Sequence, residues 1–260
     1  MTLATARPRR SVLYMPGSNT RALEKGRGLP ADALILDLED AVAPDAKMEA
    51  RGNIAEALKA GGYGKREIIV RVNALDTPWG KDDVAALAAS GADALLLPKV
   101  ESAAMVSELE GLMRDAGAPD GLAIMCMMET PRGILNADEI AGASQRLTCL
   151  VMGTSDLVKE LNAAHTPERL PVLTSLSLCV LAARAHGVAI VDGVHLDLSD
   201  DEGFAAHCRQ GKDLGFDGKT LIHPKTIAVA NEVFAPSEAD IAQARRIIVA
   251  HAEATRQGQG

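Results

Sequence analysis

Short, nearly continuous apolar runs recur along the chain, and segments with apolar residues at helical spacing separate them. Continuous runs, rather than alternating ones, are typical of parallel strands that are buried on both faces. The pattern predicts eight strands, at residues 11–15, 33–38, 67–72, 93–97, 121–128, 148–152, 187–191 and 217–222.

Helices are predicted between the strands and after the last of them. They cover residues 45–60, 80–90, 102–116, 134–144, 170–186, 201–214 and 224–233, and a final helix covers 237–256. The final helix begins with a capping box formed by Ser237 and Asp240. A glycine that favours a left-handed helix cap follows four of the other segments, at Gly91, Gly117, Gly187 and Gly215.

Eight strand–helix units in a chain of 260 residues predict a closed (β/α)8 TIM barrel with an extra C-terminal helix. We expect a single barrel domain across residues 1–260, because no linker or low-complexity stretch divides the chain. The basic segment 1–9 is expected to be disordered. An open doubly wound sheet is the alternative, but no G-x-G-x-x-G motif follows the first strand.

The composition narrows the class of partner. A net charge of −8 argues against nucleic acid or an anionic membrane as the main partner. No apolar run reaches the roughly 18 residues of a membrane span, and no signal peptide is recognisable. The four cysteines form no C-x-x-C pair, so we expect reduced thiols and a cytoplasmic location.

Three strand ends carry the residues of a candidate metal site. Catalytic side chains of a barrel lie at the carboxyl ends of its strands, where this chain has Arg71, Glu129 and Asp156. Two carboxylates are the typical protein contribution to a Mg²⁺ site. In the alternative interpretation, Glu129 pairs with Arg132 and Asp156 caps the following helix. Residue types and spacing leave both interpretations open.

Arg71 ends an apolar strand, so its guanidinium requires an anionic partner. The acidic cluster of Asp37, Glu39 and Asp40 offers that partner, and a purely structural ion pair is one interpretation. The other is a donor aimed at a carbonyl oxygen that becomes an oxyanion, and both roles are compatible. Repulsion within the cluster is expected to raise at least one carboxyl pKa, which suits acid–base catalysis.

Arg10, Arg21 and Lys25 form a basic group around the first strand–helix loop. Arg21 and Lys25 are four residues apart and share one helix face. The group is either a solvated helix face or a phosphate site. Of the six histidines, only His223 stands at a strand end, where Pro224 follows it.

Seven segments between about Arg9 and Ile241 resemble, in order, the CitE-like branch of the HpcH/HpaI aldolase and citrate lyase superfamily. That branch includes citrate lyase β subunits, malyl-CoA lyases and citramalyl-CoA lyases. The segments are RRSVLYMPGS, LILDLEDAVAPDAK, VRVNALDTPWG, LLPKVES, METPRGI, GTSDL and TLIHPKTI.

The resemblance implies a Mg²⁺-dependent barrel enzyme, with Mn²⁺ as an alternative ion. It implies reversible cleavage of a 3-hydroxyacyl-CoA thioester, such as malyl-CoA, citramalyl-CoA or a citryl thioester, to an acyl-CoA and an oxo acid. Glu129 and Asp156 fall on the family's metal ligands, and Arg71 falls on the arginine that polarises the thioester or enolate oxygen. The acidic cluster falls on the motif that orders the metal-bound waters and Arg71.

The resemblance also implies a binding site for the CoA thioester and an assembly of barrels. Arg21 and Lys25 match positions that hold CoA phosphates, and relatives form trimers or hexamers. We therefore expect a homotrimer or homohexamer. The full set that we assign to binding the CoA thioester is Arg10, Tyr14, Arg21, Lys25, His223 and Pro224.

The sequence departs from the family pattern after Ile241. Longer relatives continue into a segment whose aspartate serves as general acid or base, and no such motif follows here. The proton-transfer group therefore has no assignment. Two alternative functions stay open: a malyl-CoA thioesterase or malate synthase-like enzyme, and a citrate lyase β-like subunit that acts on a carrier-bound thioester within a complex. A pyruvate aldolase of the superfamily's other branch is a third.

Overall fold

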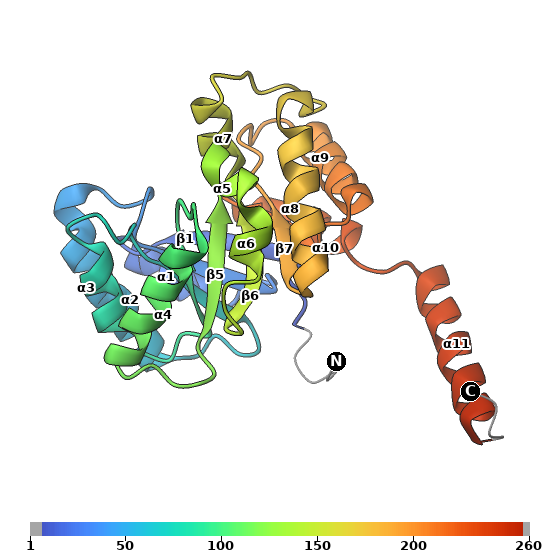
Figure 1. Ribbon diagram of the computed structural model, residues 1–260, viewed down its shortest axis with the longest axis horizontal. Helices are drawn as coiled ribbons and strands as arrows, with labels where there is room; N and C mark the ends of the chain where they lie inside the picture. Colours follow the sequence, from blue (N-terminus) through green and yellow to red (C-terminus); the bar gives the residue numbers. More distant parts are fainter. Residues whose placement is uncertain (1–6, 257–260) are drawn as a thin grey trace.

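Eight parallel strands close into a barrel in chain order, and helices surround them (Figure 1). The structure, a computed structural model, describes residues 7–256. The predicted (β/α)8 fold is confirmed, and each predicted strand overlaps an observed one. The strands are β1 (Ser11–Pro16), β2 (Ala33–Asp37), β3 (Glu67–Arg71), β4 (Ala94–Leu97), β5 (Ala123–Met128), β6 (Leu147–Met152), β7 (Ala189–Asp192) and β8 (Gly218–Leu221).

The first helix carries the face predicted for Arg21 and Lys25, and the other helices follow the predicted segments with two differences. The predicted helix 134–144 is two short helices that meet at Asn136, and a helix that the pattern did not predict begins at Thr154. The helices are α1 (Thr20–Gly26), α2 (Lys47–Ala60), α3 (Gly80–Leu87), α4 (Ala103–Asp115), α5 (Pro131–Leu135), α6 (Ala137–Ala141), α7 (Thr154–Glu160), α8 (Leu173–His186), α9 (Asp201–Leu214), α10 (Ile227–Val233) and α11 (Glu238–Arg256). Short 3-10 turns cover η2 (Pro44–Ala46), η3 (Leu170–Val172) and η4 (Pro224–Thr226).

Helix ends follow the predicted capping chemistry. Gly187 and Gly215 cap α8 and α9 in the left-handed conformation, with φ of 68° and 100°. Ser237 and Asp240 form the capping box, because each backbone N–H donates to the other's side-chain oxygen at 3.1 Å. The sequence therefore specifies where these helices stop or start as well as where they run.

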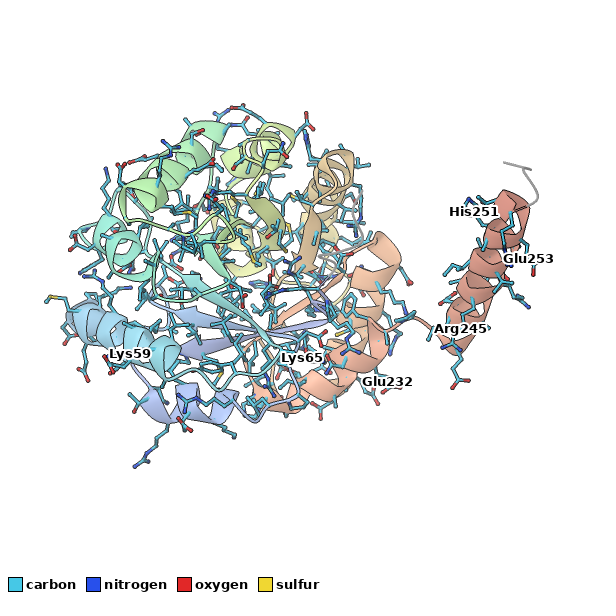
Figure 2. All side chains as sticks on the ribbon, turned by 90° about the horizontal axis from the view of Figure 1, so that it is seen from below. Lys59, Lys65, Glu232, Arg245, His251 and Glu253 are labelled. Carbon is cyan, nitrogen blue, oxygen red and sulfur yellow. The ribbon has the colours of Figure 1, made fainter. Side chains whose placement is uncertain are left out.

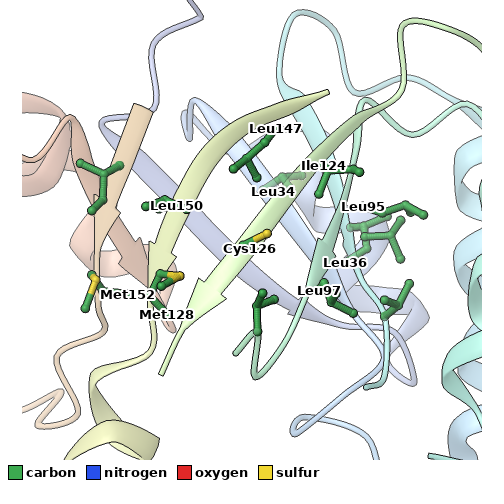
Figure 3. Close-up of a cluster of buried hydrophobic side chains, with 14 of the residues drawn as sticks. Leu34, Leu36, Leu95, Leu97, Ile124, Cys126, Met128, Leu147, Leu150 and Met152 are labelled. Carbon is green, nitrogen blue, oxygen red and sulfur yellow. The ribbon is translucent and has the colours of Figure 1, made fainter. Parts of the chain in front are cut away.

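Alternation along the strands divides the core into two layers. One set of side chains fills the barrel, and it includes Val12, Ile35, Ile69, Leu96 and Val151. The other set points outward and packs beneath the helices (Figure 3), including Leu34, Leu36, Leu95, Leu97, Ile124, Cys126, Met128, Leu147, Leu150 and Met152. Since aromatic residues are scarce, aliphatic and methionine side chains supply nearly all of this packing.

The chain is anchored at the amino end of the barrel from Arg9 onward. Residues 1–6 lie outside the described residues, and Arg9 donates two hydrogen bonds to Glu67, at 2.6 and 2.7 Å. Arg10 binds Asp32 in the same two-pronged way, with both distances 2.8 Å. The expectation of disorder up to residue 9 is therefore wrong for Arg9, because a buried carboxylate holds its guanidinium.

Helix α11 stands away from the barrel, and none of its residues is buried (Figures 1 and 2). Its exposed apolar side chains are Ile241, Ile247, Ile248 and Val249. Since none of the α11 residues is buried, the barrel core is complete without this helix.

Within residues 7–256, no helix is both long enough and apolar enough to cross a membrane.

Candidate active site

Asp37 and Arg71 end neighbouring strands and are register partners in the β2–β3 pair. Each lies two residues after an inward-facing isoleucine, Ile35 or Ile69, so both side chains point into the mouth of the barrel. Arg71 donates from Nε to Asp37 Oδ1 and from Nη2 to Asp37 Oδ2, both at 2.6 Å. This bidentate pair is the geometry that guanidinium and carboxylate favour.

Three further contacts fix the Arg71 guanidinium. The ring of Tyr14 lies 4.8 Å from its central carbon, the sulfur of Met127 lies 3.6 Å from Nη1, and Glu39 Oε2 lies 2.6 Å from Nη1. The Glu39 contact is an ion pair without hydrogen-bond geometry. Burial opposes the charge of Arg71, but Tyr14 and the hydrogen-bonded Asp37 outweigh it and raise the pKa well above its ordinary value. Arg71 is thus a permanent, oriented cation.

The acidic cluster divides into buried and exposed members. Asp37 and Glu39 are buried, whereas the side chain of Asp40 is 64% exposed and lies 3.6 Å from Arg71 Nη1. Burial raises the pKa of Glu39, and the charges of Asp40 and Asp37 add to the effect. The direction that was predicted for one carboxyl of this cluster agrees with the raised pKa of Glu39, but burial rather than repulsion is its main cause.

Glu129 follows β5 and is buried at the carboxyl end of the barrel. Its Oε1 accepts a hydrogen bond from the backbone N–H of Lys99 at 2.8 Å. A Cβ on Gly153 would lie 2.3 Å from Glu129 Oε2, so only glycine leaves room for this carboxylate. Burial raises the pKa of Glu129 to about 8, and the charge of Glu39 contributes to the rise. The charge of Arg71 acts in the opposite direction and does not cancel the effect of burial on this pKa.

Asp156 lies in the first turn of α7, and its Oδ2 is 3.4 Å from Lys99 Nζ. It does not cap the helix, because Gly153 is the N-cap residue and no side chain caps that end. Arg132 is exposed on α5 while Glu129 is buried, and Glu129 bonds to Lys99. The structural alternative for the two carboxylates therefore does not apply.

A cavity of about 330 Å³ lies at the carboxyl ends of the strands. Its polar lining includes Tyr14, Asp37, Asp40, Arg71, Glu129, Ser155 and Asp156, and its apolar lining includes Val194, Leu196 and Ile222. The strand-end residues that the sequence singled out for metal binding and oxyanion stabilisation thus share one cavity.

The residues present fit a divalent cation. Acidic groups outnumber cations here, since Asp37, Glu39, Asp40, Glu129 and Asp156 lie against Arg71, Lys99 and the buried Lys47. Ser155 Oγ is buried without a partner within the described part of the chain. No three His, Cys, Asp or Glu residues between 7 and 256 are grouped as a closed metal cage. Two carboxylates with open positions suit Mg²⁺, which retains water and substrate ligands, rather than structural zinc.

The predicted CoA-binding residues do not come together. Arg10 lies before β1, at the opposite end of the barrel from the cavity, with its guanidinium bound to Asp32. The prediction that it joins Arg21 and Lys25 is therefore wrong: its side chain serves to join β1 to the start of β2. Arg21 and Lys25 are exposed on α1.

The two residues assigned to CoA binding after β8 have a local structural role. His223 is exposed after β8, where its Nδ1 accepts the backbone N–H of Lys225 at 3.1 Å and so caps η4. Pro224 occupies the first position of η4. Neither residue lines the cavity, whereas the neighbouring Ile222 does. Of the residues assigned to CoA binding, only Tyr14 lines the cavity, where it stacks on Arg71.

The sequence patterns missed two parts of the site. Lys99 stands at a strand end, which is the signal that identified Arg71, yet the pattern assigns it no role. A buried ionic network behind the cavity was also missed: Lys219 Nζ lies 2.8 Å from Asp192 Oδ2, and Arg169 Nη1 lies 2.8 and 2.7 Å from the two Asp192 oxygens. The network anchors the start of the β7–α9 loop, which carries Val194 and Leu196 into the cavity wall.

Curated relatives match nearly the whole chain. A (3S)-malyl-CoA thioesterase of Cereibacter sphaeroides strain ATCC 17025 is 55% identical over 255 residues, covering 98% of this chain and 87% of the relative. A citrate lyase β subunit of Leuconostoc mesenteroides subsp. cremoris is 39% identical over 259 residues, covering 98% and 86%.

Solved structures and a family model agree with these relatives. CitE from Mycobacterium tuberculosis, in complex with magnesium, acetoacetate and coenzyme A, superposes with a TM-score of 0.77 at 32% identity, covering 96% of this chain and 89% of that one. RipC from Yersinia pestis superposes with a TM-score of 0.78 at 30% identity, covering 91% and 100%. The model of the HpcH/HpaI aldolase/citrate lyase family matches residues 10–224, and the chain belongs to that family.

Proposed function

We propose that this protein is a Mg²⁺-dependent thioesterase that hydrolyses (3S)-malyl-CoA or a close 3-hydroxyacyl-CoA thioester. One observation carries the proposal: the buried guanidinium of Arg71, held by Asp37, faces the same cavity as Glu129 and Asp156. That cavity joins a fixed oxyanion donor to a pair of hard oxygen ligands. The relatives named malyl-CoA thioesterases favour hydrolysis as the outcome.

In this proposal Glu129 and Asp156 hold the divalent cation. When bound, the cation supplies Lewis-acid polarisation of substrate oxygens and orients the malyl carboxylate and hydroxyl. Arg71 donates to the thioester oxygen, which becomes negative as water adds to the carbonyl carbon. The carbon–sulfur bond then breaks, the CoA thiolate leaves, and malate is released. A preorganised donor of this kind typically contributes about 3–4 kcal/mol to lowering the barrier.

Asp37 and Tyr14 act through Arg71. Asp37 occupies two of the five guanidinium N–H groups, which leaves donors on the cavity side. Tyr14 covers one face of the guanidinium plane and excludes water from it. The exposed Asp40, at the cavity lining, is the carboxylate best placed to exchange a proton with solvent. We propose it as the group that accepts the proton of the attacking water.

The second candidate is carbon–carbon cleavage, as in our expectation from the sequence. A base removes the hydroxyl proton, the C–C bond breaks, and its electron pair forms the enolate of the thioester fragment, with Arg71 at the enolate oxygen. The citrate lyase β relatives favour this outcome. Both reactions place negative charge on the same thioester oxygen, so Arg71 serves either one.

The binding of the CoA portion and the assembly of the protein are also proposals. Arg21 and Lys25 are exposed cations on α1, beside the strand that supplies Tyr14, and we propose that they meet the CoA phosphates. We propose a homotrimer or homohexamer, as the family resemblance implies. Action on a carrier-bound thioester within a complex is the third functional candidate.

The test is a product analysis with (3S)-malyl-CoA and Mg²⁺. Hydrolysis releases free CoA thiol, which a thiol reagent detects, together with malate. Carbon–carbon cleavage instead releases glyoxylate and acetyl-CoA without a free thiol. Thiol release that equals malate formation supports the thioesterase. Glyoxylate as the main product establishes the lyase, and inactivity on free CoA esters with activity on an acyl-carrier thioester establishes the complex-dependent subunit.

A further inference from the structure

Lys99 contacts three carboxylates of the candidate site. Its backbone N–H donates to Glu129 Oε1 at 2.8 Å, and its Nζ lies 3.4 Å from Asp156 Oδ2 and 3.6 Å from Glu39 Oε1. The ammonium therefore occupies the space between two carboxylates, one of which is an assigned metal ligand. Neither distance describes a tight, directional hydrogen bond, so the ammonium acts there as a point charge.

The backbone of Lys99 is held in an unusual conformation. Its φ is 51°, in the left-handed region that residues with a side chain rarely adopt. Since the N–H of this residue bonds to Glu129, the left-handed turn both orients that carboxylate and directs the side chain toward Asp156. A strained conformation that serves both contacts points to a function beyond closing the turn.

We propose that Lys99 is an internal competitor of the divalent cation. This inference rests on the proposed metal site at Glu129 and Asp156. Without a bound ion, the ammonium neutralises part of the acidic cluster and holds Asp156 and Glu39 in place. When the ion binds, Asp156 Oδ2 becomes its ligand, and repulsion between the two cations moves the ammonium away from that oxygen.

The structure allows this exchange. The side chain of Lys99 is 42% exposed and that of Asp156 is 28% exposed, so the ammonium has a route to solvent. Glu39 is more deeply buried and offers a second anionic contact that the ammonium keeps after leaving Asp156. Lys99 thereby weakens the affinity for the ion while it preserves the cluster in the metal-free protein.

Metal binding measured without catalysis tests the proposal. Mn²⁺ is titrated into the purified full-length protein, and the free aquo ion is followed by electron paramagnetic resonance. Lys99→Met removes the ammonium and keeps the stem, so we expect Mn²⁺ to bind about tenfold more tightly. Lys99→Arg keeps the competing charge and should stay within about twofold of wild type.

Lys81→Met is the matched control for net charge. Lys81 lies on α3, where its Nζ pairs with Glu108 at 3.0 Å, away from the cavity. This variant loses the same unit charge and should also bind Mn²⁺ within about twofold of wild type. Lys99→Gly is the second test variant, because it keeps the backbone donor to Glu129 and suits the positive φ. It should tighten binding as Lys99→Met does.

The outcomes separate this proposal from the metal site on which it rests. Unchanged or weaker Mn²⁺ binding in both Lys99→Met and Lys99→Gly overturns the competitor role. Equal tightening in Lys81→Met also overturns it, because net charge alone then explains the effect. If wild type binds no Mn²⁺, or if Glu129→Gln binds it as wild type does, the proposed metal site itself fails.

Discussion

The Arg71 guanidinium and the Asp37 carboxylate are joined by two parallel hydrogen bonds of 2.6 Å across adjacent strands. The pair sits where β2 and β3 end, and register pairing in the barrel places the two residues side by side. The orientation of Arg71 is thus set by the sheet rather than by a loop. Substitutions that remove the cation at Arg71 therefore affect both the chemistry of the site and the stability of the barrel.

Arg71→Lys is expected to lower kcat by about two to three orders of magnitude, because an ammonium cannot reproduce the forked donor geometry. Thermal unfolding of the variant should remain close to that of wild type, since a cation still neutralises Asp37. Arg71→Ala is the less informative variant: it leaves a buried carboxylate without its cation, at a cost of about 3–5 kcal/mol. Steady-state kinetics and melting curves on the same preparations check both points, and near-normal turnover of Arg71→Lys would refute the oxyanion role.

Gly153→Ala is expected to displace the Glu129 carboxylate, because the new Cβ would lie 2.3 Å from Oε2. We expect metal binding to weaken about 10–100-fold and stability to fall by about 1–3 kcal/mol. Gly52→Ala is the matched control, since a Cβ on this α2 glycine meets nothing within 4 Å. It should be neutral or stabilising by up to about 1 kcal/mol. Calorimetric titration with Mg²⁺ and denaturant unfolding measure both quantities, and wild-type Mg²⁺ affinity in Gly153→Ala contradicts the proposed ligand role.

Chelation of divalent cations should abolish activity. EDTA removes the ion that Glu129 and Asp156 are proposed to hold, and excess Mg²⁺ should restore the rate. At a Mg²⁺ concentration of about 100 times Kd, the ion should also stabilise the protein by about 2.7 kcal/mol. A Glu129→Gln variant should lose that stabilisation. Turnover that continues unchanged in EDTA would exclude the metal from the reaction.

His207, whose Nδ1 lies 3.0 Å from that of His195, predicts a loss of stability in acid. Burial lowers the pKa of His207 to about 4 from 6.5, and Lys219 and Arg169 add to the effect. Between pH 6.5 and about 4 the unfolded chain therefore binds a proton that the folded protein does not. This contribution to stability is present above pH 6.5 and is lost as the pH falls toward 4.

Denaturant unfolding measured from pH 7 to pH 4 checks this prediction. Between pH 7 and pH 4, the free energy of unfolding should fall less in His207→Gln than in wild type. The difference corresponds to the uptake of about one proton on unfolding. His165→Gln, at an exposed position before η3, is the control and should follow wild type. Parallel curves for wild type and His207→Gln would show that folding does not lower the pKa of His207.

The sequence predicts the barrel well because its signals are local. Buried parallel strands are short apolar runs, and glycines such as Gly187 end helices through their own backbone freedom. Helix α7 was missed because its first turn, Thr154 to Asp156, reads as the polar end of a strand. The break at Asn136 was missed for a related reason: apolar spacing continues through it while the backbone turns between α5 and α6.

The residues of the candidate site also divide into those that local sequence signals predict and those that they do not. Strand-end position was enough to bring Asp37, Arg71, Glu129 and Asp156 to one cavity, because the ends of parallel strands meet. Arg10 was misplaced because nearness in sequence does not tell which end of a strand a residue occupies. The roles of Lys99 and Lys219 depend on partners 57 and 27 residues away, at Asp156 and Asp192, and no local pattern contains that information.

The rates at which the four cysteines react can measure local opening of the barrel. All four are buried, and burial raises the pKa of each thiol. Cys149 lies in the layer inside the barrel, Cys126 in the layer outside it, and Cys179 and Cys208 beneath α8 and α9. A reagent that modifies thiolates reaches each cysteine only after the layer around that cysteine has opened. The labelling rate of Cys149 in the native protein therefore reports on opening of the barrel interior, and the rates of Cys179 and Cys208 report on detachment of α8 and α9.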